Sequence, residues 1–588
     1  MLHTARNTPS VPASTGILAA LGPAMEDFIV NVTDFVWGGV WNGQSVLPAG
    51  PVVVILLGAG MYFMLRLGFR PLRRFGPALA ELWRGRKGDG SDNAITPWQA
   101  LSTALSGQVG TGNLAGVATA ITLGGPGAIF WMWVTAFFGM ALAFSESSLA
   151  VKYRETDEYG RINGGPMYYI KNGLSKKWTL VAVLFCLGTI FSAAATGGMT
   201  QSNSITQTVV RSGGDLGVAV PTWSVGAVLA VLVFAVIIGG IKSIGTVAGR
   251  VVPVMAALYV GAALIVLIMN IGAVPGAFMT IITSAFGLQE AAGGLAGYTM
   301  VMAVRFGVDR GLFSNEAGQG SAPIAHAATS IKNPVKQGEI DMIGVLIDTL
   351  VICTMTALVV LSVPGDFKRS PAMAAYDACE AAGVVSLPDG LDHDDVFPGA
   401  YVIGRDALVA ANGAQAANLL EACQADRPDL VTDAAIAAAR DGSVDQVARA
   451  WQADLEASAV TNAAYNAAIP FGGWIVTICL ALFAFTTIIG WSYYAEQAIT
   501  YLIGEWATHP IRFVWVFVIF IGALTEVGFV WMLGGLANAS MAVPNLIAIL
   551  ALSSVVMAMH RKNGDPDTES GESVMLNSSD RKTPAAGE

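Results

Sequence analysis

The sequence is dominated by apolar runs, each long enough to cross a lipid bilayer as a helix. A transmembrane helix needs about 20 mostly apolar residues. Only 13% of the 588 residues are charged, whereas soluble proteins carry roughly a quarter. Such a chain cannot cover its surface with polar groups, so we expect an all-α polytopic membrane protein. The predicted spans number about eleven and lie near residues 49–69, 98–123, 127–151, 179–198, 222–241, 247–272, 292–312, 340–363, 471–498, 511–534 and 541–559.

Connections rich in Lys and Arg alternate along the chain with connections that are short or acidic. The connection after the first span, residues 70–97, and that after the third, residues 152–178, are rich in both. Every second connection that follows is basic again. Because Lys and Arg accumulate in cytoplasmic loops, the pattern predicts an N-terminus outside and a C-terminus in the cytoplasm. We expect a multi-pass protein of the bacterial plasma or inner membrane.

A hydrophilic insert at residues 364–470 falls on the outer side of this topology. Between Asp366 and Glu456 there are 16 acidic residues against 6 basic ones, which accounts for the whole net charge of −10. The acidic balance is therefore a property of the insert, and no nucleic-acid partner is expected. The insert either forms a small helical cap or is a tolerated loop insertion without function. Its two cysteines, Cys379 and Cys423, can pair if the insert faces an oxidising compartment.

The other cysteines and the histidines give no sign of catalysis. Cys186, Cys353 and Cys479 lie in apolar runs and fit small packing residues. The five histidines have no partner at a metal-ligand spacing, so no metal centre of the zinc type is expected. No nucleophile with a paired base is visible either. The sequence therefore does not predict an enzyme.

Two segments, one in the middle of the second predicted span and one at the end of the seventh, cannot be continuous lipid-facing helices. The first, Ser106-Gly-Gln-Val-Gly-Thr-Gly-Asn113, contains three glycines within six residues, and each glycine weakens a helix by about 1 kcal/mol. The second, residues 311–323, contains the carboxylate of Glu316, three glycines and the helix-ending Pro323. Irregular backbone at membrane depth is tolerated where it lines a protein cavity.

Broken helices of this kind suit a transport site. Free N–H groups at half-helix N-termini suit an anionic group, and free carbonyls suit a cation. A substrate with a carboxylate that moves together with a cation matches both. The glycines could instead serve helix packing or a kink, but two such segments, five spans apart on helices of opposite direction, are typical of an inverted repeat. A channel would instead need polar residues along several helices.

Four motifs resemble the alanine/glycine:cation symporter family, the sodium:alanine symporters. They are Ser106-Gly-Gln-Val-Gly-Thr-Gly-Asn113, Gly164-Gly-Pro-Met-Tyr168, Arg310-Gly-Leu-Phe-Ser-Asn-Glu-Ala-Gly318 and Ile489-Gly-Trp-Ser-Tyr-Tyr-Ala-Glu496. The resemblance implies the leucine-transporter-type fold, with two inverted five-helix repeats after one extra N-terminal helix. It also implies a secondary active transporter that takes up alanine or glycine with sodium by alternating access. A proton-coupled or broader-specificity amino-acid permease of the same fold is the alternative.

The predicted spans and the resemblance divide the chain into five parts. A monomer is compatible with this organisation. The predicted parts are an N-terminal arm with an interfacial helix (1–48), the first span with its basic cytoplasmic loop (49–97), the first repeat (98–275), the second repeat (276–559, interrupted by the insert at 364–470) and a cytoplasmic tail (560–588).

The same resemblance implies the residues of the binding site. The positions that match the family's substrate contacts are Thr111, Gly112, Asn113, Gln201, Phe313, Ser314, Asn315 and Trp491. The positions that match its sodium ligands are the carbonyls of Ser106 and Val109 and the hydroxyls of Thr486 and Thr487. Neutral oxygens of this kind suit Na+, a hard cation that must also be released.

Several of these residues have a simpler explanation. Trp491 could be an aromatic residue of the membrane interface, and Gln201 could hydrogen-bond a neighbouring helix. Thr486 and Thr487 could bond the carbonyls of their own helix. Glu316 is costly in a membrane, and it could tie the broken helix together. Three further acids in or near the membrane have no predicted role: Glu146, Asp348 and Glu496.

Overall fold

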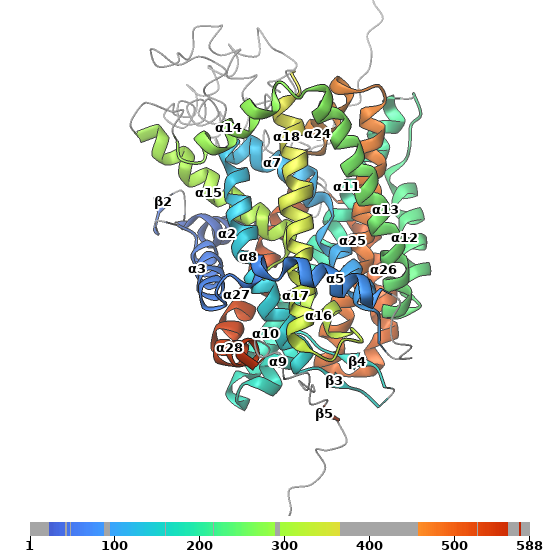
Figure 1. Ribbon diagram of the computed structural model, residues 1–588. Coiled ribbons are helices and arrows are strands. Elements are labelled where there is room, and N and C mark those ends of the chain that lie inside the picture. The colour runs from blue at the N-terminus through green and yellow to red at the C-terminus, as the bar shows by residue number, and fades with distance from the viewer. Residues whose placement is uncertain are drawn as a thin grey trace, which may run out of the picture.

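The computed structural model describes ten segments of the chain, and over these it is almost entirely helical (Figure 1). The segments are residues 23–41, 44–47, 49–86, 94–158, 160–215, 217–287, 294–364, 457–525, 527–562 and 576–577. Two small sheets accompany the helices. In the first, β1 (Val40–Trp41) pairs antiparallel with β2 (Gln44–Ser45). In the second, β3 (Glu155–Thr156) pairs antiparallel with β4 (Ile162–Asn163) and parallel with β5 (Leu576–Asn577).

Seven helical stretches among the described residues are long and apolar enough to cross a membrane. Four of them lie in single helices, namely α8 (Gly127–Lys152), α13 (Gly240–Met269), α25 (Gly472–Ile503) and the part Leu533–Ala551 of α27 (Val527–Ala551). Two are made of several consecutive elements: Lys176–Gly214 comprises η2 (Lys176–Trp178), α10 (Thr179–Ser192), η3 (Ala193–Thr200) and most of α11 (Gln201–Asp215), and Pro334–Ser362 comprises α17 (Pro334–Val345), η4 (Leu346–Cys353) and α18 (Thr354–Ser362). The last, Glu505–Leu524, comprises η6 (Glu505–Ala507) and α26 (Thr508–Leu524). The prediction of a polytopic helical membrane protein is confirmed.

Further helices complete the body. Four of them are apolar: α3 (Pro51–Arg66), α7 (Ala115–Gly124), α12 (Thr222–Ile237) and α14 (Val274–Ser284). The others are α2 (Pro23–Gly38), α4 (Arg70–Arg73), α5 (Phe75–Gly85), α6 (Pro97–Gln108), η1 (Thr111–Asn113), α9 (Pro166–Gly173), α15 (Gly294–Asn315), α16 (Ala322–Ala327), α24 (Ala457–Ala468) and α28 (Ser553–Lys562).

Local signals fix where helices begin. Thr96 and Gln99 form a capping box at the start of α6, in which each side chain bonds the backbone N–H of the other residue. Asn333 caps α17 by accepting from the N–H groups of Val335 and Lys336. Proline follows each of these caps, at the position where its missing N–H costs nothing.

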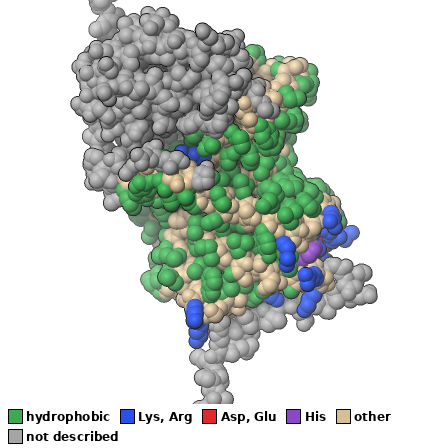
Figure 2. Space-filling view, turned by 90° about the vertical axis from the view of Figure 1, so that its left-hand side faces the viewer, with side chains coloured by type: hydrophobic (Ala, Val, Ile, Leu, Met, Phe, Trp, Pro, Cys, Tyr) green, Lys and Arg blue, Asp and Glu red, His purple; other side chains and the backbone are tan. Residues whose placement is uncertain are grey.

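The helices pack into one body with an apolar exterior. Helix α8 lies against α3, α15 and α17, while α10 packs on α27 and α13 packs on α6 and α25. Figure 2 shows apolar side chains over much of the described surface, with the visible Lys and Arg side chains mostly towards one end. Among the most exposed are Val231, Ile268 and Phe517. An apolar belt of this kind suits contact with lipid chains.

The last two predicted spans have wrong boundaries. Helix α26 ends at Leu524 and α27 begins at Val527, so the chain turns inside the predicted span 511–534. Thr525 has extended backbone angles, and the polar pair Thr525–Glu526 interrupts the apolar run there. Helix α27 then continues to Ala551, so the predicted span 541–559 begins too late.

The N-terminal arm and the insert are described in part. The predicted interfacial segment is α2, whose Trp37 Nε1 donates to the Gly535 carbonyl at 3.1 Å while Phe28 remains exposed. Residues 365–456 of the predicted insert, with Cys379 and Cys423, lie outside the described residues. The end of that range forms α24, which packs on α7 and α25 and buries Tyr465.

Candidate functional site

The first broken helix changes direction at the predicted glycines. Helix α6 ends at Gln108, Val109 and Gly110 are extended, and the short turn η1 leads into α7. The Gly110 N–H donates to Asn113 Oδ1 at 2.9 Å, which closes the turn. A side chain at Gly110 would meet Thr487 Oγ1 at 2.6 Å, and one at Gly112 would meet the Phe313 ring at 2.9 Å. These glycines therefore allow the backbone to approach α25 and the second broken helix.

The second break lies between α15 and α16 and is held by Glu316. Three residues here have left-handed backbone angles: Glu316 at φ 58°, Gly318 at φ 87° and Gly320 at φ 85°. Glu316 Oε2 accepts from Ser321 Oγ at 2.6 Å, and Oε1 accepts from Trp491 Nε1 at 2.9 Å. A non-glycine residue in this conformation is strained by about 1–3 kcal/mol. The two hydrogen bonds of its carboxylate stabilise the turn against that cost.

A second carboxylate supports the same break from another helix. The Gly318 N–H donates to Glu146 Oε2 at 3.3 Å, and Asn545 Nδ2 donates to the Gly318 carbonyl at 2.9 Å. Asn545 also donates to Glu146 Oε1 and accepts from the Tyr169 hydroxyl. Glu146, which has no predicted role, thus lies beside the break together with Asn545. No motif in the sequence singles out Asn545, which follows Pro544 in an otherwise mostly apolar run.

The two breaks meet through side chains predicted to contact substrate. Asn113 Nδ2 lies 3.1 Å from Ser314 Oγ. Gln201 Oε1 accepts from the Thr111 N–H at 3.1 Å, and Gln201 Nε2 donates to the Thr196 carbonyl at 3.1 Å. The Thr111 hydroxyl is buried and has no hydrogen-bond partner in the described part of the chain. The structure therefore brings Thr111, Gly112, Asn113, Gln201, Phe313 and Ser314 together.

Asn315 and Trp491 lie beside this group but direct their polar atoms elsewhere. Asn315 Nδ2 donates to Thr349 Oγ1 at 3.1 Å, and its Oδ1 accepts from the Ala317 N–H at 3.0 Å. Trp491 is only 1% exposed, and Gly197 lies directly against its ring. The ring therefore faces the protein interior, not the membrane interface.

Two of the four predicted sodium ligands, the Thr487 hydroxyl and the Val109 carbonyl, lie close together. Thr487 Oγ1 is 3.4 Å from the Val109 carbonyl oxygen, and Gly490 packs against Ser106 one turn before Val109. Thr487 also donates to the Phe483 carbonyl of its own helix at 3.1 Å. The structure does not bring Thr486 to this point. Its hydroxyl bonds the Phe483 carbonyl at 2.9 Å and lies 3.5 Å from Met255 Sδ of α13.

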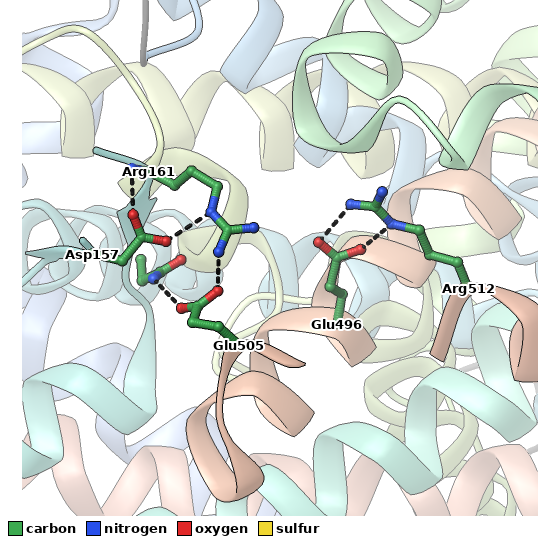
Figure 3. A network of polar contacts seen from close by, with 6 residues as sticks. Asp157, Arg161, Glu496, Glu505 and Arg512 are labelled. Carbon is green, nitrogen blue, oxygen red and sulfur yellow. Dashed lines mark hydrogen bonds and ion pairs between the residues drawn. The ribbon is translucent and has the colours of Figure 1, made fainter. Parts of the chain in front are cut away.

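A cavity of about 260 Å³, with several charged side chains in its lining, lies near the C-terminal end of α25. Arg512 donates from Nε and Nη2 to the two oxygens of Glu496, at 2.8 and 2.9 Å. Arg161 donates to Asp157 at 2.7 Å and to Glu505 (Figure 3). Glu496, another acid without a predicted role, is thus paired at this cavity. The further lining residues are Ile95, Ile162, Asn163, Gly239, Gly240, Ile241, Lys242, Ala328, Tyr493, Gln497, Thr500 and Thr508.

Comparison with known proteins agrees with the resemblance of the motifs. The family model of the sodium:alanine symporter family matches residues 25–388 and 431–574. The sodium/alanine symporter AgcS of Methanococcus maripaludis is 38% identical over 90% of this chain and 96% of its own length. A Bacillus subtilis protein provisionally named sodium/proton-dependent alanine carrier, YrbD, is 34% identical over 90% of each chain. The probable sodium/glutamine symporter GlnT of Bacillus subtilis is 41% identical over 56% of this chain and 66% of its own.

The residues matched by the family model include both broken helices and the polar residues between them. The names and the family describe transporters that couple an amino acid to a cation, not enzymes. The chain therefore belongs to the sodium:alanine symporter family and is a multi-pass, cation-coupled amino-acid transporter.

Proposed function

We propose that the protein takes up alanine or glycine together with sodium by alternating access. The observation that carries this proposal is the meeting of two broken helices around small residues. Gly112 lies against the Phe313 ring, and Asn113 bonds Ser314 across the two breaks. Backbone this close leaves little room for a long side chain. A small amino acid is therefore the substrate that suits the site.

The substrate's two charged groups would be held by different breaks. The Thr111 hydroxyl has no partner in the described residues and is the donor available for a carboxylate. Gly112 and Asn113 would complete this end of the site with backbone and amide groups. Phe313, Ser314 and Asn315 would hold the amino group and shape the side-chain pocket. Gln201 would reach the bound amino acid from α11, and Trp491 would limit the pocket from α25.

The coupling sodium ion would lie between the first break and α25. The carbonyls of Ser106 and Val109 and the hydroxyl of Thr487 are its proposed ligands, and they suit Na+ because all three are neutral oxygens. Thr486 would join them only if its hydroxyl left the Phe483 carbonyl that it bonds here. An ion at this point would fix the distance between α25 and the first break.

The proposed architecture is two inverted five-helix repeats after one extra N-terminal helix, eleven membrane helices in all. Its support is the position of the breaks, one inside the second predicted span and the other directly after the seventh. A second support is the alternation of basic connections. It favours an N-terminus outside, and the Arg512 cavity would then lie at the cytoplasmic end. Substrate released from the breaks would leave through this cavity, which α25 connects to the sodium site.

Uptake of radiolabelled alanine by proteoliposomes tests the proposal. An inward sodium gradient should drive uptake without a proton gradient, and unlabelled glycine should compete while valine and glutamine should not. The second candidate is a proton-coupled or broader amino-acid permease, which the names of YrbD and GlnT favour. Uptake driven by a proton gradient without sodium, or competition by glutamine, would support this second candidate.

A further inference from the structure

Helix α5 is an amphipathic helix at the surface of the molecule that the proposed transport site does not use. It lies crosswise over α17, against which it packs (Figure 1). Ala78 and Leu82 are buried on its inner side. Leu79 and Trp83 are 48% and 62% exposed, and a spacing of four residues places them beside each other on one face. Large apolar side chains that gather on an outer face usually mark a contact with lipid or protein.

Ion pairs hold the chain before α5 at the end of a membrane span. Arg70 Nη2 and Arg74 Nε lie 2.7 and 3.1 Å from the same carboxylate oxygen of Glu339. Glu339 is buried near the N-terminus of α17, where the span Pro334–Ser362 begins. Helices α4 and α5 therefore lie at the level of the membrane surface. The basic connections predict that this is the cytoplasmic surface.

The positive charges of this region outnumber its acids. Two arginines share the carboxylate of Glu339, and Lys336 Nζ lies 3.4 Å from the Glu81 Oε1 atom. Arg73 and Arg84 are both exposed. None of the ion pairs formed between residues that the structure describes includes either of them. Their charges are therefore available to an anion outside the protein.

A histidine on α28 is subject to the same positive charge. Arg70 Nη1 lies 3.0 Å from His560 Nδ1, and an arginine can only donate in such a contact. The pKa of His560 lies below its usual value, because the ring is partly buried and because Arg70 and Arg561 lie close by. A further positive charge is thus disfavoured at this surface, whereas an anion would be stabilised there.

The outer face of α5 combines an apolar and a basic part in the way that a membrane interface requires. The guanidinium carbon of Arg86 lies 4.0 Å from the centre of the Trp83 ring. Tryptophan favours the headgroup level of a bilayer, and a helix with Leu and Trp beside arginines lies in the plane of the interface. Arginine also donates paired hydrogen bonds to phosphate. A phospholipid offers both partners, since it has acyl chains and a phosphate.

We propose that helices α4 and α5 form a binding surface for an anionic phospholipid of the cytoplasmic leaflet. Leu79 and Trp83 contact the acyl chains, and Arg73 and Arg84 contact the negatively charged headgroup. A zwitterionic lipid brings its own positive charge, which the arginines repel, so the surface selects anionic lipids. A second copy of this chain would bring the same arginines against each other and suits the surface less. The surface consists of Leu72, Arg73, Leu79, Trp83, Arg84 and Arg86.

The test measures which lipid lies beside α5 in vesicles that contain the full-length protein. A bimane fluorophore is attached to Ala80→Cys, an exposed position on α5, after the native cysteines have been replaced. Phosphatidylglycerol or phosphatidylcholine with brominated acyl chains, diluted into unbrominated phosphatidylcholine, quenches the fluorophore when it binds there. Because each arginine near an anionic lipid surface contributes about a fivefold factor in affinity, we expect phosphatidylglycerol to bind at least about tenfold more tightly than phosphatidylcholine.

Two double variants separate this site from a general effect of charge. Arg73→Gln with Arg84→Gln should bring the affinity ratio of the two lipids close to one. Lys176→Gln with Lys177→Gln removes the same charge from exposed positions before α10 and should leave the ratio unchanged. If the double arginine variant does not fold, Arg84→Gln alone should lower the ratio about fivefold.

Three outcomes would overturn the inference. The first is an affinity ratio near one in the labelled parent chain. The second is an equal loss in the two double variants, since the preference would then follow the overall charge of the cytoplasmic face. The third is the absence of quenching by either lipid together with cross-linking of two Ala80→Cys chains, which would show that a second copy covers α5. None of these measurements involves alanine uptake, so their result is independent of the proposed function.

Discussion

At the scale of single residues, the hydrogen bond between Trp491 and Glu316 joins α25 to the second break. The donor and the acceptor are both buried, at 1% and 2% exposure, and their separation is 2.9 Å. A hydrogen bond to a charged group contributes about 1.5–3 kcal/mol. Trp491 therefore has two roles in the proposed site, since it bounds the pocket and also stabilises the strained turn at Glu316.

Trp491→Phe keeps a ring in place and removes only the indole N–H. We expect the free energy of unfolding to fall by about 1–3 kcal/mol, because Glu316 Oε1 loses its donor in a buried position. Thermal unfolding of the purified protein measures this. Trp515→Phe is the matched control, since the buried indole nitrogen of Trp515 has no hydrogen-bond partner among the described residues. Equal losses in the two variants would contradict a role for the Glu316 bond.

Gln201→Ala tests the contact between α11 and the first break. We expect alanine affinity to fall by about fivefold, because one neutral hydrogen bond contributes about 1 kcal/mol. Asn203→Ala is the control on the same helix, since Asn203 bonds the carbonyls of Gly522 and Thr525 and none in the breaks. Binding of labelled alanine at saturating sodium is the measurement. Wild-type affinity in Gln201→Ala would leave this residue with a role in helix packing alone.

At the scale of elements, α25 connects three parts of the molecule. Thr487 lies beside Val109, Trp491 bonds the second break, and Glu496 binds Arg512 at the cavity. Thr487 and Glu496 are nine residues apart, which is about 13 Å along a helix. A shift of this one helix would therefore change the proposed sodium site and the cavity together.

Thr487→Ala should raise the sodium concentration for half-maximal alanine uptake several-fold and change the maximal rate less. The reason is that the hydroxyl is a proposed ligand of the ion and does not contact the substrate. Thr486→Ala is the comparison, and we expect a smaller rise because its hydroxyl points to Phe483 and Met255. An equal rise would mean that Thr486 turns towards the ion during transport. An unchanged sodium dependence of uptake in Thr487→Ala would contradict the proposed sodium site.

The elements also show how far the sequence can be interpreted. Both breaks are predictable, because glycine, proline and a carboxylate inside an apolar run have no other stable place in a membrane. The turn at Thr525 is not predicted, since a hydropathy average over 20 residues passes over two polar positions. The partners of Glu146 and Asp348 cannot be predicted either. Asn545 is 399 residues from Glu146, and a single sequence carries no signal for a contact at that distance.

At the scale of the whole molecule, the proposed orientation makes the loops accessible from opposite sides. Gly272 follows α13, and a side chain there meets no other atom within 4 Å; Lys177 precedes α10 and is exposed. A membrane-impermeant thiol reagent applied to intact cells should label Gly272→Cys and should label Lys177→Cys only after permeabilisation. The parent chain needs its native cysteines replaced first. The reverse labelling pattern would invert the topology.

The two ion pairs at the cavity differ in how firmly they hold the molecule together. The side chains of Arg161 and Glu505 are 44% and 33% exposed, and exposed pairs contribute less than about 1 kcal/mol. Arg512 and Glu496 are each 11% exposed and form two parallel hydrogen bonds. If the cavity is the exit, Arg161 and Glu505 are therefore the contact that can open and close at little cost. Arg512 and Glu496 would keep α25 and α26 joined while the contact between Arg161 and Glu505 opens and closes.

Removing each arginine in turn separates these roles. Arg161→Gln should leave the melting temperature nearly unchanged but alter the rate of alanine efflux from loaded proteoliposomes, and the difference from wild type should shrink at high salt. Arg512→Gln should lower the free energy of unfolding by about 3–5 kcal/mol, because Glu496 would remain buried without its partner. Glu496→Gln in the Arg512→Gln background removes that unpaired charge and should recover part of the loss. A stable Arg512→Gln protein, or an efflux rate insensitive to Arg161, would show that the barrier at this end of the molecule lies in other contacts.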